Sequence, residues 1–427
     1  MSGAVLHPIV FGFTPAEISS IPNLRVVREH ASEAGFLWRQ RHRAIGAPHY
    51  KLKHLQMLDE RVSAHLAGLC LAGDTGWQFA LEALANDDPG AVFSATYLAF
   101  DSGVGSRIDH VLALALAEPA YADAFLHAMA WLPAEKVEST LALLAGSTLA
   151  QHRLLSCTAV VLRRDQDWAD IPRFIEDEDP AVRTRALYAV GVLKRGDLRS
   201  FLADALHGQD KQCRLWAAWS SALFGDPQSA PTLFEIGLSC PDTARFSTEA
   251  AMRCAEHDWA RQTISTLAAE PQMRRLAFIA TGAFGDPTTV PWLIKHSGDE
   301  RFGALAGEAI STITGADLKY LDLNKERPDN DDFGADTQDE EKEDNDLPWP
   351  DPERLQAWWT TQSHRYVEGQ RYLCGEVVSE SESRRILRDG YQRQRAAAAF
   401  ELARLNPQAA LFPTHARADR QTGRLSA

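Results

Sequence analysis

The residues best spaced for chemistry are four acid–arginine pairs that recur at nearly constant intervals. The arginines open successive predicted helices 31, 31 and 29 residues apart, and each has an acid three or four residues upstream. The arginines are Arg183, Arg214, Arg245 and Arg274, and the acids are Asp179, Asp210, Asp242 and Glu270. Such a series could bind an anionic partner along a groove, or it could hold stacked repeats together through salt bridges. We favour the internal salt bridges.

Other chemical signatures are weak or missing. None of the fourteen histidines is followed by Glu, so the repeated His-Glu pairs of a helical di-iron enzyme are not available. The chain has no Gly-x-Ser-x-Gly elbow, Walker loop or Rossmann fingerprint. Asp329, Asp331, Gly334 and Glu340 match part of a calcium loop, but Phe333 occupies its fifth position. We therefore expect no catalytic residue, no cofactor and no metal site.

A group of histidines near the N-terminus also does not predict a metal site. His42, His49 and His54 lie among arginines and lysines rather than among acids or thiols, which favours a solvated basic loop over a metal site.

Composition and charge narrow the class of protein. The chain has 427 residues, 45% hydrophobic and 24% charged, with a net charge of −14. We find neither an apolar run of the roughly 20 residues that span a bilayer nor a secretory signal. The spacing of the six cysteines does not suggest disulfide pairs, which is typical of reduced thiols. We expect a cytoplasmic protein without membrane association, for which nucleic acid is an unfavourable partner.

The elements that carry the acid–arginine pairs are repeats. Gly285-Asp286-Pro287 has a near twin at Gly225-Asp226-Pro227, and weaker copies begin at His257 and Gly196, giving spacings of 29, 32 and 28 residues. Each unit is predicted to contain a short helix that begins at the Asp and Pro, followed by a longer Ala-rich helix. The longer helices are predicted at 181–194, 211–224, 243–256, 272–284 and 301–314.

This pattern resembles the HEAT repeat and its shorter bacterial relatives, the phycobilisome-lyase-like repeats. The resemblance implies an all-α fold, a right-handed α-α superhelix whose second helices line a concave face. We expect about eight units, with the acid–arginine pair missing from the unit at 134–166.

Changes in composition along the chain predict four regions. They are an N-terminal cap (1–72), the repeat array (73–316), an acidic, disordered linker (317–347) and a small Arg-rich helical region (348–427). Residues 328–346 hold ten acids and one lysine, so the linker alone contributes −9 and the rest of the chain only −5. The final region has twelve arginines and no lysine. The overall charge therefore says little about the concave face.

The whole chain resembles a bacterial HEAT-repeat family whose members are often encoded beside type VI secretion components. The resembling stretches are 55–69, 310–318, 347–352, 358–359, 369–375 and 390–395. The resemblance implies a cytosolic adaptor, chaperone or immunity-type accessory of that system, and it supplies no catalytic residues.

We predict a non-catalytic scaffold that binds a protein partner, such as a type VI secretion component or effector. Trp358, Trp359, Arg393 and Arg395 are predicted to form a docked cap or a second contact surface. The alternatives are HEAT-like enzymes such as a bilin lyase or a DNA glycosylase-like protein. Trp216, Trp219, Trp259 and Trp292 raise the second alternative, but aromatic residues in Ala-rich repeats usually fill gaps between units.

Overall fold

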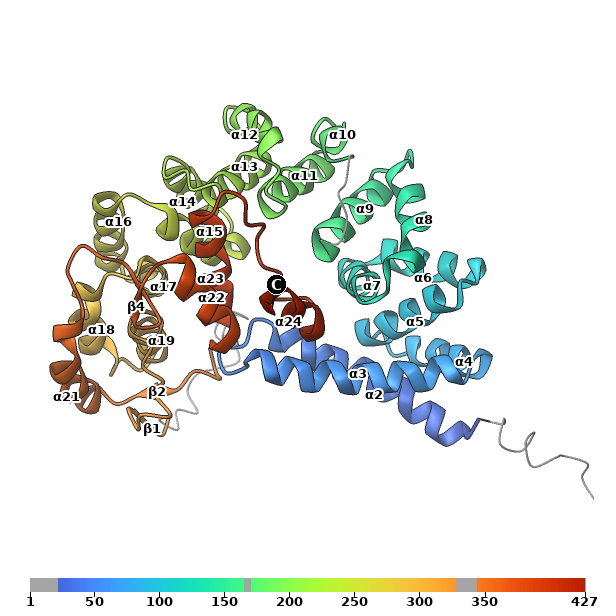
Figure 1. The fold of residues 1–427 in the computed structure, drawn as a ribbon, viewed down its shortest axis with the longest axis horizontal. Helices are drawn as coiled ribbons and strands as arrows, with labels where there is room; N and C mark the ends of the chain where they lie inside the picture. The colour runs from blue at the N-terminus through green and yellow to red at the C-terminus, as the bar shows by residue number, and fades with distance from the viewer. Residues whose placement is uncertain (1–21, 165–169, 328–343, 427) are drawn as a thin grey trace, which may run out of the picture. The chain divides into compact units, whose positions relative to one another are not determined.

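The structure is a computed structural model that describes residues 22–164, 170–327 and 344–426 (Figure 1). The prediction of an all-α fold is confirmed, because helices dominate these residues and the strands are only two residues long. Across the described ranges, no helix has the length and hydropathy that a bilayer-spanning segment needs. The residues that match part of a calcium loop, 329–340, lie outside the described residues.

The chain divides into two compact units. The first comprises Met1–Gln40 and Glu60–Leu132, and the second comprises Arg41–Asp59 and Pro133–Ala427.

The first unit is built from helices around an aromatic core. Trp38 stacks on Phe93 with ring centroids 4.9 Å apart, and Trp131 meets Phe93 edge-on at 5.4 Å. Its helices are most of α2 (Leu24–Ala44) and α3 (Leu52–Leu71), with α4 (Asp74–Leu84), α5 (Pro89–Ser102), α6 (Gly105–Ala117) and α7 (Pro119–Trp131). Residues 73–132, predicted as the start of the array, thus group with the N-terminal helices.

The second unit contains six consecutive helix pairs within its described residues. The first helices are α8 (Ala134–Ala145), α10 (Ile171–Ile175), α12 (Arg199–Leu206), α14 (Ser229–Leu238), α16 (His257–Ala269) and α18 (Val290–His296). The second helices are α9 (Ala150–Arg163), α11 (Pro180–Val192), α13 (Lys211–Leu223), α15 (Pro241–Cys254), α17 (Arg274–Phe284) and α19 (Gly303–Thr314). The predicted second helices agree with these bounds to within about three residues.

Small residues allow consecutive second helices to pack closely against each other. Ala217, Ala218 and Ala222 of α13 are completely buried. Gly191 of α11 lies so close to Ser220 of α13 that a side chain would not fit there. The Ser220 hydroxyl donates a 2.7 Å hydrogen bond to the Leu187 carbonyl and so joins the two helices. The Ala-rich pattern therefore reflects the close contact of adjacent repeats.

The Gly-Asp-Pro motif marks the boundary between units. Gly285 ends α17 in the left-handed conformation with φ of 82°, which glycine adopts without steric cost. The Asp286 carboxylate then accepts a hydrogen bond from the Thr288 backbone N–H and caps the 3-10 turn at Pro287–Thr289, as the sequence predicts.

The segment after the array packs back onto it. Strand β1 (Asn324–Lys325) pairs antiparallel with β2 (Trp349–Pro350), and β3 (Tyr372–Leu373) pairs with β4 (Glu376–Val377). Leu318, Leu323 and Leu347 are buried, so both described ends of the predicted linker contribute to the core of the second unit. The helices of this segment are α21 (Pro352–Gln362), α22 (Glu380–Asp389), α23 (Gln392–Leu405) and α24 (Ala418–Ser426).

Candidate functional site

Residues 366–424, which we call the C-terminal segment, run back along one edge of the array. In the second unit α23 packs against α13 and α15 (Figure 1). The last carbonyls of an α-helix have no partner within the helix and carry partial negative charge. The C-terminal segment supplies donors to these carbonyls, one second helix after another.

The contacts begin at the last repeat. At the end of α19 the backbone N–H of Cys374 donates to the Thr312 carbonyl over 2.7 Å. At α17 the N–H of Tyr372 donates to the Gly285 carbonyl over 2.8 Å. Arg371 then links two repeats, since its guanidinium donates to the carbonyls of Phe284 and Arg253.

The same edge continues toward the first repeats. Lys194 donates from its ammonium group to the Leu223 carbonyl of α13 and to the Ala403 carbonyl of the C-terminal segment. The N–H of Leu411 donates to the Val192 carbonyl of α11 over 3.0 Å. Arg424 reaches the Arg164 carbonyl beyond α9 over 2.8 Å. The C-terminal segment therefore donates to the carbonyl ends of five second helices, and Lys194 of the array links the sixth, α13, to it.

A buried ionic cluster anchors this arrangement. Glu401 of α23 is completely buried and accepts hydrogen bonds from Arg371 at 2.6 Å and from Arg404 at 2.9 Å. Burial by itself would raise the pKa of Glu401, but Arg371, Arg404 and Arg253 together hold that pKa below its ordinary value. The sequence analysis did not predict this cluster. The twelve arginines of the C-terminal region were the sequence feature that could have indicated it.

The predicted acid–arginine pairs occupy different roles in the structure. Asp179 and Asp210 cap the N-termini of α11 and α13. The Arg183 guanidinium donates to the carbonyls of Asp177 and Glu178, which lie in the turn before α11, at 2.9 Å each. Glu270 accepts a hydrogen bond from Gln272. Among the described residues Asp242, Arg214 and Arg274 form no ion pair, so the salt bridges between repeats that we favoured are not seen at these positions.

One such salt bridge occurs where none was predicted. Arg153 of α9 lies 30 residues before Arg183 and binds both carboxylate oxygens of Asp177, at 2.6 and 2.8 Å. Its hydrogen bond lowers the pKa of Asp177. The unit at 134–166 has no acid three or four residues upstream of Arg153, as expected, but its arginine pairs instead with an acid in the turn of the following unit.

Arg245 has a different set of partners. Together with Arg275 and Arg393 it forms what we call the arginine cluster, around the carboxylate of Asp344. Asp344 lies 2.5 Å from Arg275, 3.3 Å from Arg393 and 3.5 Å from Arg245, measured between nitrogen and oxygen. Arg393 and Arg245 also pair with Glu308, at 2.9 and 3.5 Å. The structure thus brings together two predicted residues, one from the repeats and one from the C-terminal region.

The other predicted C-terminal residues are less accessible. Arg395 is completely buried and donates to the Leu387 carbonyl at 2.7 Å and to Gln421 at 2.5 Å. Trp359 is buried, its ring centroid lies 5.1 Å from that of Tyr366, and it belongs with Trp358 to the core formed around α18 and α19. These contacts make Arg395 and Trp359 part of the interior.

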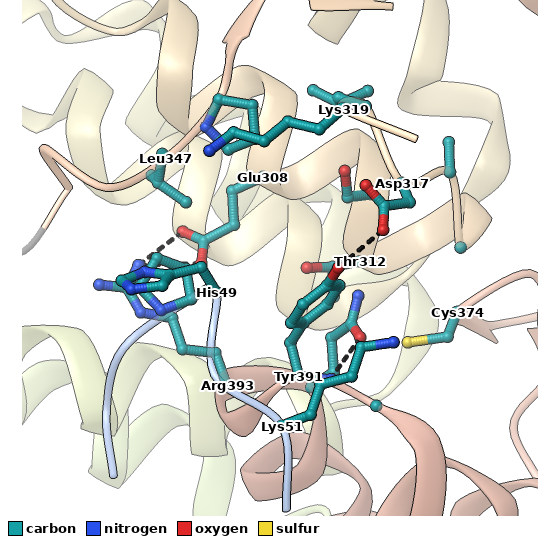
Figure 2. A pocket seen from close by; sticks show the side chains of 18 of the residues that line it. His49, Lys51, Glu308, Thr312, Asp317, Lys319, Leu347, Cys374, Tyr391 and Arg393 are labelled. Carbon is teal, nitrogen blue, oxygen red and sulfur yellow. Dashed lines mark hydrogen bonds and ion pairs between the residues drawn. The ribbon is translucent and has the colours of Figure 1, made fainter. Parts of the chain in front are cut away.

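A cavity of about 510 Å³ lies beside the arginine cluster (Figure 2). Four of the stretches that carry the family resemblance line it: 310–318, 347–352, 369–375 and 390–395. Tyr391 donates its hydroxyl to Asp317 at 2.7 Å, as the dashed line in Figure 2 shows, and the Lys51 ammonium lies 4.5 Å from the Tyr391 ring centroid. His49, which we placed in a basic loop, lies at the mouth of this cavity 3.7 Å from Asp346.

Two groups that line this cavity, Cys374 and Tyr391, hold their protons more tightly than usual. Burial raises the pKa of the Cys374 thiol to about 12. Burial and the hydrogen bond to Asp317 raise the pKa of Tyr391 to about 12. Both groups are therefore protonated at neutral pH.

The cysteines provide a direct test of these environments. Burial raises the pKa values of Cys157, Cys254 and Cys374 to about 12. Cys157 and Cys254 are also shielded from solvent, whereas Cys374 is partly exposed, as are Cys70 and Cys240. In the native protein at pH 8, we expect a thiol reagent to label Cys70 and Cys240 at least tenfold faster than Cys157, Cys254 and Cys374, because labelling requires a thiolate as well as access. Mass spectrometry of digested, labelled protein gives the order, and early labelling of Cys374 would contradict the environment described.

A second open surface lies on the second helices of the earlier repeats, and we call it the aromatic groove. It is a cavity of about 420 Å³ lined by Leu154, Pro180, Ala181, Thr184, Arg185, Tyr188, Asp210, Gln212 and Trp216. Trp216 meets Tyr188 edge-on at 4.8 Å and stacks on Phe246 at 5.1 Å. The Arg185 guanidinium lies 5.4 Å from the Tyr188 ring centroid. Aromatic and arginine side chains of this kind are enriched in protein interfaces.

The second unit is thus a solenoid of two-helix repeats. The family model for HEAT repeats matches residues 171–253, a stretch that holds most of the aromatic groove. HEAT repeats generally act as scaffolds for protein interaction. The search of curated proteins found no similar protein, and neither did the search of solved structures.

Proposed function

We propose that this chain is a non-catalytic, cytoplasmic protein-binding scaffold that serves a bacterial type VI secretion system as an adaptor, chaperone or immunity-type accessory. The observation that carries the scaffold role is the aromatic groove, an open surface formed by α9, α11 and α13. The link to secretion rests on the family resemblance of the stretches that line the cavity of Figure 2.

The C-terminal segment explains why the groove lies where it does. The segment lies at the carbonyl ends of the second helices: its Leu411 N–H donates to Val192 of α11, and Lys194 donates both to Leu223 of α13 and to Ala403 of the segment. The groove is lined by Pro180, Ala181 and Gln212, which lie at the opposite, N-terminal ends of α11 and α13. A partner could therefore bind the array without displacing the C-terminal segment.

The enzyme alternatives gain no support from the cavity of Figure 2. Its tyrosine and its cysteine are both held protonated by their surroundings. A bilin lyase or glycosylase activity would need a nucleophile or base that these two groups do not supply.

The experiment is affinity capture from the native cytosol with matched variants. Ala181→Arg with Gln212→Arg places two cations in the groove at exposed positions, and Ala203→Arg with Asp204→Arg places two cations on exposed positions of α12. We expect the groove variant to lose at least tenfold of the captured partner, as quantified by mass spectrometry, and the α12 variant to retain it.

The outcomes separate the two parts of the proposal. Equal capture by both variants would remove the groove from the mechanism. Groove-dependent capture of proteins unrelated to secretion would leave the scaffold role intact and remove its assignment to type VI secretion.

A further inference from the structure

We infer that the aromatic groove binds a proline-rich, extended segment of the partner protein, in which an acidic residue pairs with Arg185. The inference rests on the proposed scaffold function and names the chemistry of the partner that the groove would hold. The residues that it assigns to binding are Arg185, Tyr188, Gln212 and Trp216.

The groove offers an aromatic surface that passes from one repeat to the next. Tyr188 of α11 meets Trp216 of α13 edge-on with ring centroids 4.8 Å apart, and Phe246 of α15 stacks on Trp216 at 5.1 Å. All three rings are only partly buried. The pyrrolidine rings of a polyproline II helix pack on aromatic surfaces of this kind, and the helix loses little entropy on binding because it is already extended.

The groove also presents hydrogen-bond donors that have no partner. Within the described part of the chain, no hydrogen bond is made by the Tyr188 hydroxyl, the Trp216 indole N–H or the Gln212 amide. The groove's carboxylate, that of Asp210, already accepts a hydrogen bond from the Cys213 N–H and caps α13. The lining of the groove therefore calls for acceptors more than for donors.

A polyproline II segment supplies the matching groups. Its carbonyls have no partner within the segment, and its prolines have no N–H that the groove would leave unpaired. An α-helix in the same place would use its carbonyls internally and leave the donors of the groove unmatched. The donor pattern thus favours an extended, proline-rich occupant over a helical one.

Arg185 adds a charge that no acid of the described residues neutralises in an ion pair. Its guanidinium lies 5.4 Å from the Tyr188 ring centroid, and its side chain is partly buried. An ion pair in such a partly shielded place is stronger than one on an open surface. Charge complementarity therefore places an acidic residue of the partner at Arg185.

Single-stranded nucleic acid is the other class of partner that aromatic and arginine side chains bind, since its bases stack on them. Such a site needs several cations along the path of the phosphates. The residues that line the groove include one cation, Arg185, and one acid, Asp210. This balance suits a segment with a single carboxylate better than a strand with a phosphate at every step.

Fluorescence polarisation with the full-length chain tests the inference. The probe is a fluorescein-labelled, amidated peptide with one Glu between two runs of six prolines. We expect it to bind at least tenfold more tightly than the same peptide with Lys in place of Glu. We expect a similar advantage over a peptide in which alternating Gly and Ser replace the prolines, because that chain is flexible and must be ordered on binding.

Arg199 supplies the matched control for Arg185. Its guanidinium lies 5.1 Å from the Phe224 ring centroid, on α12 and outside the groove. Arg185→Glu should weaken binding of the Glu peptide at least tenfold and reverse the preference in favour of the Lys peptide, whereas Arg199→Glu should leave both affinities within twofold. A reversed preference is a result that a misfolded variant cannot give.

Trp216→Phe tests the hydrogen bond to the segment separately. The change keeps an aromatic ring and removes the N–H, so we expect binding of the Glu peptide to weaken about fivefold. Circular dichroism reports whether the variant folds. An unchanged affinity would remove the indole N–H from the interaction and contradict the match between groove donors and segment carbonyls.

The inference is overturned by equal affinities for the Glu and Lys peptides, or for the proline and Gly-Ser peptides. Tighter binding of a twelve-nucleotide single strand than of the Glu peptide would also overturn it, in favour of nucleic acid. Groove-dependent capture of a partner from the cytosol, combined with no binding of the Glu peptide, would reject this inference alone and leave the proposed function standing.

Discussion

Glu401→Gln is expected to lower the free energy of unfolding of the second unit by about 3–5 kcal/mol, because it leaves buried arginines without their counter-charge. Arg371 and Arg404 both bind the Glu401 carboxylate, and Glu401 has no exposed surface. Urea denaturation followed by circular dichroism measures the change. A loss under 1 kcal/mol would mean that the cluster does not hold the C-terminal segment.

A matched control lies one helix earlier. Glu382 pairs with Arg385 at the same i, i+3 spacing as Glu401 and Arg404, but this pair is partly exposed. Glu382→Gln should therefore cost no more than about 1 kcal/mol. Residue type and spacing are shared, whereas burial differs, and so does position, since Glu382 lies in the first turn of α22 and Glu401 near the end of α23.

The effect of Glu401 also has a pH window. Its folded pKa lies below the ordinary value of 4.5, so its contribution to stability is present above that pH and is lost as the pH falls through the folded pKa. The difference between the unsubstituted chain and Glu401→Gln should be constant from pH 7 to 5 and shrink below 4.5. A difference that grows on acidification would contradict the direction of the shift.

Gly285→Ala is expected to destabilise the second unit by about 3 kcal/mol or more, from two separate causes. Its φ of 82° costs an alanine roughly 1–2 kcal/mol. In addition, a methyl group there would overlap the carbonyl of Tyr372, so the C-terminal segment would have to move and lose the hydrogen bond from Tyr372 to Gly285.

Gly369 separates the two causes. It has a φ of 83°, and no atom lies within 4 Å of the position that a Cβ would take. Gly369→Ala should therefore lower stability by only about 1–2 kcal/mol. Thermal unfolding of both variants gives the comparison, and similar melting temperatures would show that the contact between Gly285 and Tyr372 is not tight.

The repeat architecture was predictable because its signals are local and periodic. The Gly-Asp-Pro boundaries depend on backbone conformation and capping, which involve residues two or three apart, as at Gly285 and Asp286. Asp179 and Asp210 were placed correctly at helix starts, but their partners turned out to be backbone N–H groups rather than arginines. A spacing pattern specifies where a side chain lies and leaves its partner undetermined.

The contacts of the C-terminal segment could not be predicted in this way. Arg371 reaches a carbonyl 118 residues away, and Arg164 reaches one 247 residues away. No periodic pattern links such pairs, and a backbone carbonyl has no residue type to recognise. The preference for arginine over lysine in the C-terminal region was the one sequence feature that pointed to these contacts. A guanidinium can donate to several carbonyls at once, as that of Arg371 does.

The order in which the C-terminal segment fastens the array has a consequence for biosynthesis. A ribosome makes α9 through α19 before it makes residues 366–424, and the fastening then proceeds from the newest repeat back to the oldest. Until that segment is made, the carbonyls of Thr312, Gly285 and Val192 lack the N–H donors that it supplies, and Phe400 and Ala403 have yet to join their core. Folding of the second unit is thus completed only after residues 366–424 have been made, so a product truncated before them would present an unfinished edge that chaperones and proteases can recognise.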